Sequence, residues 1–140
     1  MKMLVAVDGS EVADRAVDHV IALARCGAAL DIHVLNVRIP VESGHVRLFV
    51  HPRDLEDYYR EEGLAELAKA ARRLDEAGLA HTDHIAVGHI AVTIARYVDE
   101  RGFDALVMGT HGRGGLRKML MGSVAQHVLL HIARPVTFVK

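Results

Sequence analysis

The sequence lacks most of the features that mark an extracellular or membrane protein. It has one cysteine, Cys26, in 140 residues, so no disulfide can form within the chain and a reducing compartment is expected. No hydrophobic run approaches the ~18 residues of a membrane span. The first apolar stretch, Met3 to Val7, is too short for a secretory signal. We therefore expect a soluble, cytoplasmic protein with no membrane partner.

Aromatic side chains and excess positive charge are also scarce. Tryptophan is absent and aromatic residues make up 4% of the chain, which removes most platforms for stacking nucleic-acid bases. The 17 basic and 18 acidic residues give a net charge of −1, whereas polynucleotide binding depends on neutralising many phosphates. We therefore expect no nucleic-acid partner.

The pattern of apolar residues predicts a single α/β domain covering residues 1–140. At 140 residues and 51% hydrophobic composition, the chain suits one core. Short apolar runs alternate with helical segments, which predicts an open parallel five-stranded sheet with helices on both faces, of Rossmann-like type. The expected strands cover 2–7, 30–37, 84–87, 104–108 and 136–139, and the expected helices run from Ser10 to Gly27 and over 54–77, 91–101 and 123–133.

A glycine-rich loop follows the fourth expected strand, where ligands bind in sheets of this kind. It runs from Gly109 to Gly115, and Gly122 and Ser123 follow at the start of the last helix. It is not a Walker A loop, because Gly114 is not followed by lysine. It is not a dinucleotide fingerprint either, because Arg117 stands where a glycine is required.

The composition of this loop favours an anion. Glycine amides can approach a ligand closely, and Gly122 and Ser123 add the positive end of a helix dipole. Arg113 lies between the two glycine clusters and can screen a phosphate chain. The first 104 residues hold 12 basic and 18 acidic side chains, but residues 105–140 hold five basic and none acidic. The alternative is a tight turn in which Ser123 merely caps the helix.

The spacing Gly109-x2-Gly112-x9-Gly122-Ser123 resembles the nucleotide-binding signature of the universal stress protein family. The segments VAVDGS and DIHVLNV resemble the first two strands of that family, so the resemblance spans the whole chain. It implies the universal stress protein type of fold, ATP bound across the carboxyl edge of the sheet, and a homodimer through the last strand, Val136 to Val139. Because the glycines are all present, the resemblance is to the ATP-binding branch.

The resemblance also implies a role for each site residue. Gly109 and Gly112 would wrap the phosphates, and Gly122 and Ser123 would meet them from the last helix. The backbone of Val34 would take the adenine edge.

Asp8 would bond the ribose or the adenine side of the nucleoside. Its position directly after an apolar strand leaves three roles open for Asp8. It would accept hydrogen bonds from ribose hydroxyls, bind Mg²⁺, or serve only as a turn residue. At Gly88 the sequence departs from the family, which often continues Gly-x-Pro, whereas here Ile90 occupies the proline position.

The ten histidines stand out in the composition. His127 and His131 have the i, i+4 spacing of a metal pair, but no third ligand is near in sequence, so packing is the better interpretation. His111 lies in the glycine loop and would either donate to a phosphate oxygen or shape the turn.

No pairing of a nucleophile with a base can be read from the chain, so no catalytic residue is predicted. The leading hypothesis is a dimeric, ATP-dependent regulator in stress response that acts on an unknown protein partner, with Mg²⁺ accompanying the ATP. The alternatives are a slow ATPase or a nucleotidyl or phosphoryl transferase, and a dimeric scaffold that binds no nucleotide.

Overall fold

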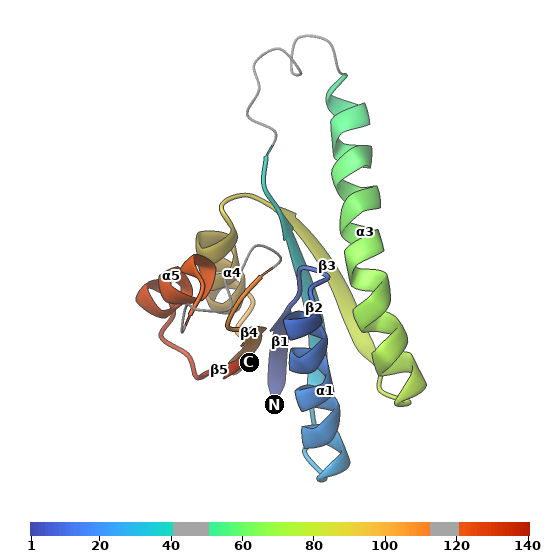
Figure 1. Ribbon diagram of the computed structural model, residues 1–140, viewed down its shortest axis with the longest axis vertical. Coiled ribbons are helices and arrows are strands. Elements are labelled where there is room, and N and C mark those ends of the chain that lie inside the picture. The colour runs from blue at the N-terminus through green and yellow to red at the C-terminus, as the bar shows by residue number, and fades with distance from the viewer. Residues whose placement is uncertain (41–50, 113–120) are drawn as a thin grey trace.

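The chain folds around one parallel β-sheet. The computed structural model describes residues 1–40, 51–112 and 121–140. Its strands are β1 (Lys2–Ala6), β2 (Asp31–Arg38), β3 (His81–Val87), β4 (Ala105–Gly109) and β5 (Val136–Val139). Their order across the sheet is β3-β2-β1-β4-β5, and every pair of neighbours is parallel. The predicted fold class is therefore confirmed (Figure 1).

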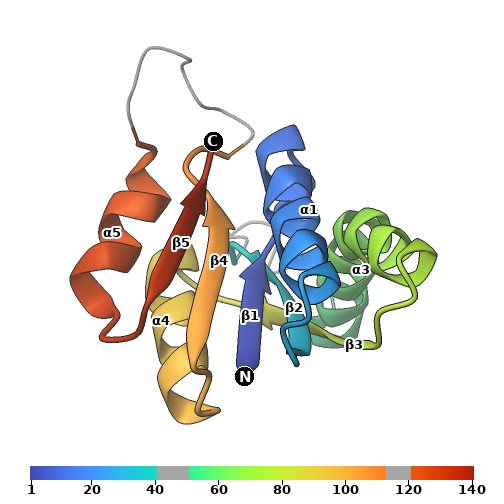
Figure 2. The ribbon, with the colours of Figure 1, turned by 90° about the horizontal axis from the view of Figure 1, so that it is seen from below.

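Helices cover both faces of the sheet. Helices α1 (Glu11–Arg25) and α3 (Pro52–Glu76) lie on one face, and α4 (Ile90–Glu100) and α5 (Ser123–His131) lie on the other (Figure 2). Each face of the sheet has a hydrophobic core. Alternate residues of β1 contribute to one core or the other, because successive side chains of a strand point to opposite faces. Met3 and Val5 pack with α1 and α3, whereas Leu4 and Ala6 pack with α4 and α5. Strand β1 is thus buried on both sides, as its unbroken apolar run predicts.

Helix α1 begins and ends where the local sequence predicts. The Ser10 hydroxyl accepts a hydrogen bond from the Ala13 amide at 3.2 Å, which satisfies one of the free amides of the first turn. After the helix, Gly27 has a φ of +92°, a left-handed conformation that glycine adopts without steric cost. The predicted cap and stop are both confirmed.

Most element boundaries differ from the prediction, by one to three residues. Strand β3 begins at His81 rather than at residue 84, because its polar first half pairs with β2, starting from Ile32 opposite His81. An edge strand tolerates such polar residues, since part of its surface faces water. Helix α3 begins at Pro52, two residues earlier than predicted, in agreement with the preference of proline for the first helical turn.

Helix α3 is the longest element, with 25 residues. It passes the carboxyl ends of the strands and extends beyond the sheet (Figure 1). In the described part of the chain, no helix combines the length and apolar character needed to cross a membrane.

Candidate functional site

A cavity of about 650 Å³ opens at the carboxyl edge of the sheet. Its walls come from the ends of β1, β2 and β4 and from the start of α5. This is the edge at which open parallel sheets bind ligands, near the point where the strand order reverses. Six residues predicted for the site line the cavity: Asp8, Gly109, His111, Gly112, Gly122 and Ser123. Arg113, also predicted, lies outside the described residues.

Asp8 is held at the mouth of the cavity by the turn that follows β1. Gly9 supplies the left-handed conformation of this turn, with φ +76°. One carboxylate oxygen of Asp8, Oδ1, accepts hydrogen bonds from the Ser10 amide at 3.0 Å and the Ser10 hydroxyl at 2.6 Å. The other oxygen, Oδ2, lies only 2.7 Å from the place that a Cβ on Gly112 would occupy. A side chain at position 112 would therefore require the Asp8 carboxylate to move.

The other two glycines also lie where a side chain would collide with the protein. A Cβ on Gly109 would lie 2.9 Å from Cγ1 of Val12 in α1. A Cβ on Gly122 would lie 3.1 Å from the Thr110 carbonyl oxygen, which accepts a 2.7 Å hydrogen bond from the Gly122 amide. The glycines thus let the loop, α1 and α5 approach one another closely at the cavity wall.

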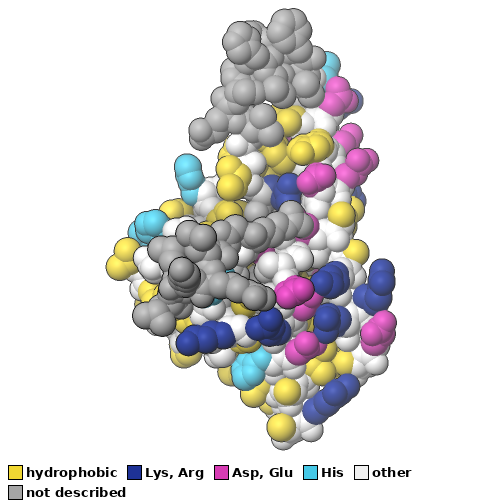
Figure 3. All heavy atoms as spheres, in the orientation of Figure 1, with side chains coloured by type: hydrophobic (Ala, Val, Ile, Leu, Met, Phe, Trp, Pro, Cys, Tyr) yellow, Lys and Arg dark blue, Asp and Glu magenta, His cyan; other side chains and the backbone are white. Residues whose placement is uncertain are grey.

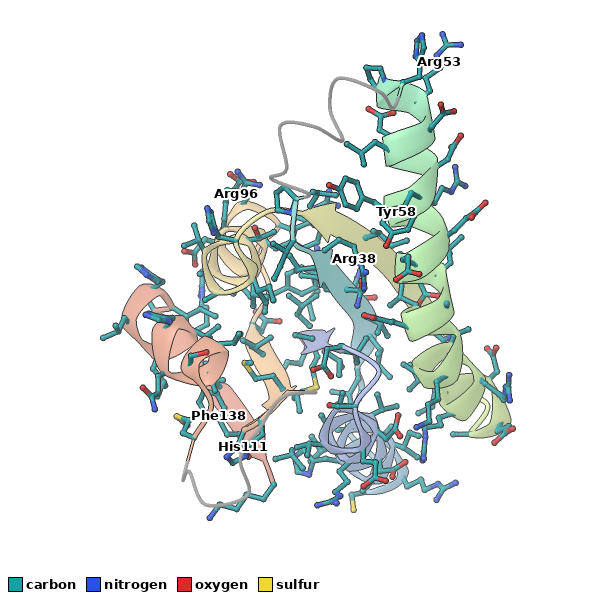
Figure 4. All side chains as sticks on the ribbon, turned by 45° about the horizontal axis from the view of Figure 1, so that its top comes forward. Arg38, Arg53, Tyr58, Arg96, His111 and Phe138 are labelled. Carbon is teal, nitrogen blue, oxygen red and sulfur yellow. The ribbon has the colours of Figure 1, made fainter. Side chains whose placement is uncertain are left out.

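The remaining wall is largely apolar and carries charge at one end. Leu35, Ile94 and Met108 contribute hydrophobic side chains to the lining of the cavity. At the end beside α3, Arg38 donates to Glu66 at 2.7 Å and to Glu62 at 3.0 Å. Figure 4 shows Arg38 between β2 and α3, and His111 on the other side of the carboxyl end of β1. Polar side chains therefore lie at both ends of an apolar cleft.

Asn36 connects this end of the cavity to the Asp8 turn, and sequence reasoning missed it. Its amide nitrogen donates to the Val7 carbonyl oxygen at 2.9 Å and to Glu66 at 2.6 Å, and the residue is 1% exposed. Buried polar groups of this kind are found where they are hydrogen-bonded. The sequence does show an asparagine inside the apolar run of β2. Its partner Glu66 lies 30 residues away, so the hydrogen bond between them could not be predicted locally.

Val34, whose backbone is predicted to take the adenine edge, is not among the residues that line the cavity. Val34 is fully buried in the middle of the strand, between Val5 and Asp83, and packs in the core under α1 and α3. The next residue, Leu35, does line the cavity. Adjacent strand residues face opposite sides of the sheet, and the part of the cavity that β2 contributes at this level lies on the α4 side.

His111 lies in the cavity wall next to Thr110. Its Nδ1 is 2.9 Å from the Thr110 hydroxyl oxygen. Thr110 itself is 3% exposed and also lines the cavity. The sequence identified the histidine as a site candidate but gave no indication of the threonine.

The other histidines form no metal centre among the described residues, where no group of three or more histidine, cysteine or acidic side chains is arranged to hold an ion. His127 and His131 are exposed and line a second, smaller cavity with His89. In the part of the sheet formed by β2 and the edge strand β3, His33 Nδ1 lies 2.8 Å from His84 Nε2. That pair joins β2 to β3 and was not predicted.

Charge on the surface is mixed rather than of one sign. On the face drawn in Figure 3, acidic side chains gather along the upper part of α3, while basic side chains lie lower on the molecule. Lys69 and Arg73 of α3 pair with Asp14 and Asp18 of α1, which ties the two helices together. No broad basic surface appears on this face.

The whole chain, residues 1–140, matches the model of the universal stress protein family. The chain belongs to the universal stress protein family. It is 32% identical over 145 residues to universal stress protein YxiE of Bacillus subtilis, covering 99% of this chain and 98% of that protein.

Solved structures of the family share the fold. The structure of MJ0577 from Methanocaldococcus jannaschii is similar with a TM-score of 0.81 at 28% identity, covering 99% of this chain and 94% of that one. A universal stress protein from Archaeoglobus fulgidus in complex with dAMP is similar with a TM-score of 0.70 at 24% identity, covering 100% and 98% of the two chains.

Proposed function

We propose that this protein binds ATP, accompanied by Mg²⁺, in the cavity at the carboxyl edge of the sheet. The observation that carries the proposal is the cavity lining, in which the Asp8 carboxylate lies opposite Gly112 and Gly109 and Gly122 lie beside it, at the start of α5. Glycines allow an anion to approach the backbone closely, and the positive end of the helix dipole favours phosphate. A cavity of about 650 Å³ falls within the range of small-molecule and cofactor sites.

The residues present fit each part of the nucleotide. The apolar surface of Leu35 and Ile94 suits a flat base, and the side-chain hydroxyl of Ser123 with the loop amides suits phosphate oxygens. Asp8 would accept hydrogen bonds from the ribose hydroxyls or bind the metal ion. Bound dAMP in the Archaeoglobus fulgidus relative supports an adenine nucleotide as the ligand class.

Isothermal titration calorimetry with ATP tests the proposal. We expect binding in the micromolar range and a loss of at least about tenfold in Gly112→Ala, equivalent to about 1.4 kcal/mol. The added methyl group would displace the Asp8 carboxylate, because the two cannot be 2.7 Å apart.

The matched control is Gly78→Ala, at the end of α3. Gly78 has φ +71° and open space around it, so this variant reports the general cost of a glycine substitution away from the cavity. ATP should bind it as tightly as the wild type. A wild-type protein that binds no ATP, or Gly112→Ala with unchanged affinity, would refute the proposal.

We further propose that the protein acts as a homodimeric, nucleotide-dependent regulator in stress response in the cytoplasm. Strand β5 lies at the edge of the sheet, and its Val136, Phe138 and Val139 are only partly buried. An uncovered apolar edge strand is a surface for pairing with a second copy. Nucleotide in the cavity would then alter the surface that the dimer presents to a partner protein.

A further inference from the structure

A second cavity, of about 340 Å³, lies next to the proposed nucleotide site. It is formed by the start of α4 and one side of α5, two helices that are neighbours on the same face of the sheet (Figure 2). Four residues line both this cavity and the main one: Ile39, Ile90, Ser123 and Val124. The two cavities therefore adjoin at the start of α5, where the proposed function places the phosphate groups of the nucleotide.

Three histidines, His89, His127 and His131, give the second cavity its polar chemistry. All three are exposed, and none has a hydrogen-bond or ion-pair partner among the described residues. Of the described residues that line the cavity, none is acidic and none is lysine or arginine. The three imidazoles are not arranged to hold a metal ion, as judged over the described residues. They are therefore available as hydrogen-bond donors to an anion.

The two helix ends at this cavity act in the same direction as the imidazoles. His89 directly precedes α4 and Gly122 directly precedes α5, and neither helix has a side-chain cap or an acidic residue in its first turn. Helix α1, by contrast, has the Ser10 cap and two acidic residues in its first turn. The amides of a helix N-terminus carry partial positive charge, so the starts of α4 and α5 favour a negatively charged group in the cavity.

We propose that the second cavity binds the terminal phosphate of a nucleoside triphosphate whose base and ribose occupy the main cavity, with His89 and His127 donating to phosphate oxygens. The inference rests on the proposed function, because the nucleotide must reach the second cavity past Ser123. His127 follows Ser123 by about one helical turn, roughly 6 Å along the axis of α5. His89 directly precedes Ile90, which lines both cavities.

This arrangement makes the histidines selective for the number of phosphates. The single phosphate of AMP would end beside the glycines and Ser123, whereas the longer chain of ATP would continue to His89 and His127. The two histidines would then strengthen the binding of ATP and leave that of AMP unchanged.

The charge of histidine makes this selectivity depend on pH. Histidine gains its positive charge between about pH 8 and pH 5, and charge-assisted hydrogen bonds are about twice as strong as neutral ones. We therefore expect the ratio of ATP affinity to AMP affinity to be larger at about pH 6 than at about pH 8. The phosphates also titrate in this range, so the contribution of the histidines is the difference between wild type and a variant that lacks them.

Calorimetric titration of the protein with ATP and with AMP at both pH values tests the inference. At about pH 6, the double variant His89→Gln/His127→Gln should bind ATP at least about tenfold more weakly than wild type and should bind AMP equally well. The ATP-to-AMP ratio should also depend less on pH in this variant. His19→Gln is the control, because His19 lies on α1 and lines neither cavity, and it should match wild type for both nucleotides.

The outcomes separate this inference from the proposed function. An unchanged ATP affinity in the double variant, or equal losses for ATP and AMP, would overturn the inference. If wild type binds both nucleotides and the double variant keeps the same ATP-to-AMP ratio, the proposed function stands and only the role of the second cavity is wrong. A wild type that binds neither nucleotide refutes the proposed function itself.

Discussion

At the scale of single residues, the surroundings of His84 shift its pKa. The side chain lies beside His33, and its ring also meets Tyr97 edge-on at 5.3 Å between ring centroids. Burial lowers the pKa of His84 below its usual value of 6.5, and His33, Arg101 and Lys2 lower it further, against an opposing effect of Asp83. The folded protein therefore holds His84 neutral at a pH at which the unfolded chain takes up a proton.

This pKa difference predicts acid sensitivity. Because the folded pKa is the lower one, stability is present above pH ~6.5 and is lost as the pH falls from there through the folded pKa. We expect His84→Gln to reduce the drop in melting temperature between pH 7.5 and pH 5 relative to wild type, since glutamine does not titrate.

Thermal unfolding at the two pH values measures this effect. His127→Gln is the control, because His127 is exposed on α5 and its replacement should leave the drop unchanged. A drop in His84→Gln as large as that of wild type would show that other groups cause the acid sensitivity.

At the scale of elements, Gly63 decides how closely α3 packs on the sheet. A Cβ at this position would lie 3.0 Å from both Cδ1 and Cγ2 of Ile85 in β3. Glycine inside a helix costs about 1 kcal/mol relative to alanine, so sequence reasoning finds it unfavourable within α3. The contact with Ile85 gives the reason for its presence, because the helix lies against the strand where a side chain would clash.

The contact predicts that the effect of Gly63→Ala on the free energy of unfolding changes sign when Ile85 is replaced. Gly63→Ala should destabilise the wild type by roughly 1 kcal/mol, because overpacking outweighs the gain in helix propensity. In the Ile85→Ala background, the same change should stabilise the protein by up to about 1 kcal/mol, because the clashing atoms are gone.

Urea denaturation gives both free energies of unfolding. Stabilisation by Gly63→Ala in the wild-type background would show that α3 can move away from β3 without cost, contrary to this account.

At the scale of the whole molecule, β5 lies at one edge of the sheet, where we propose that a second copy of the chain pairs. The Leu106 amide donates to the Pro135 carbonyl oxygen, and the Thr110 amide donates to the Val139 carbonyl oxygen. In a parallel ladder, alternate residues bond to the same neighbour, so residues 135, 137 and 139 face β4. The amides of Val136 and Phe138 consequently point to the open edge.

This geometry selects a substitution that weakens association but spares the internal ladder. Val136→Pro removes a donor from the open edge and is compatible with an edge strand, so we expect a dimer in wild type and a monomer, or at least about tenfold weaker association, in the variant. Val136→Thr retains the amide and should remain a dimer.

Sedimentation velocity at micromolar protein measures the difference, with circular dichroism to check the fold. A monomeric wild type, or a Val136→Pro variant that is still fully dimeric, would contradict association through β5.

The sequence by itself determined the kind and order of the elements and indicated the family. Apolar runs of strand length, the Ser10 cap and the Gly27 stop depend on interactions within a few residues, so they could be predicted locally. The glycine spacing from Gly109 to Gly122 likewise indicated the family, and family membership and fold class are confirmed.

The tertiary structure alone decided which residues meet. The pleat of β2 sends Leu35 rather than Val34 to the cavity. Asn36 reaches Glu66 across 30 residues, and His33 reaches His84 across 51. These pairings follow from strand register and helix packing, which depend on burying both faces of the sheet together. Because no local sequence pattern encodes that condition, the contacts that hold the site residues in place could be identified only from the folded chain.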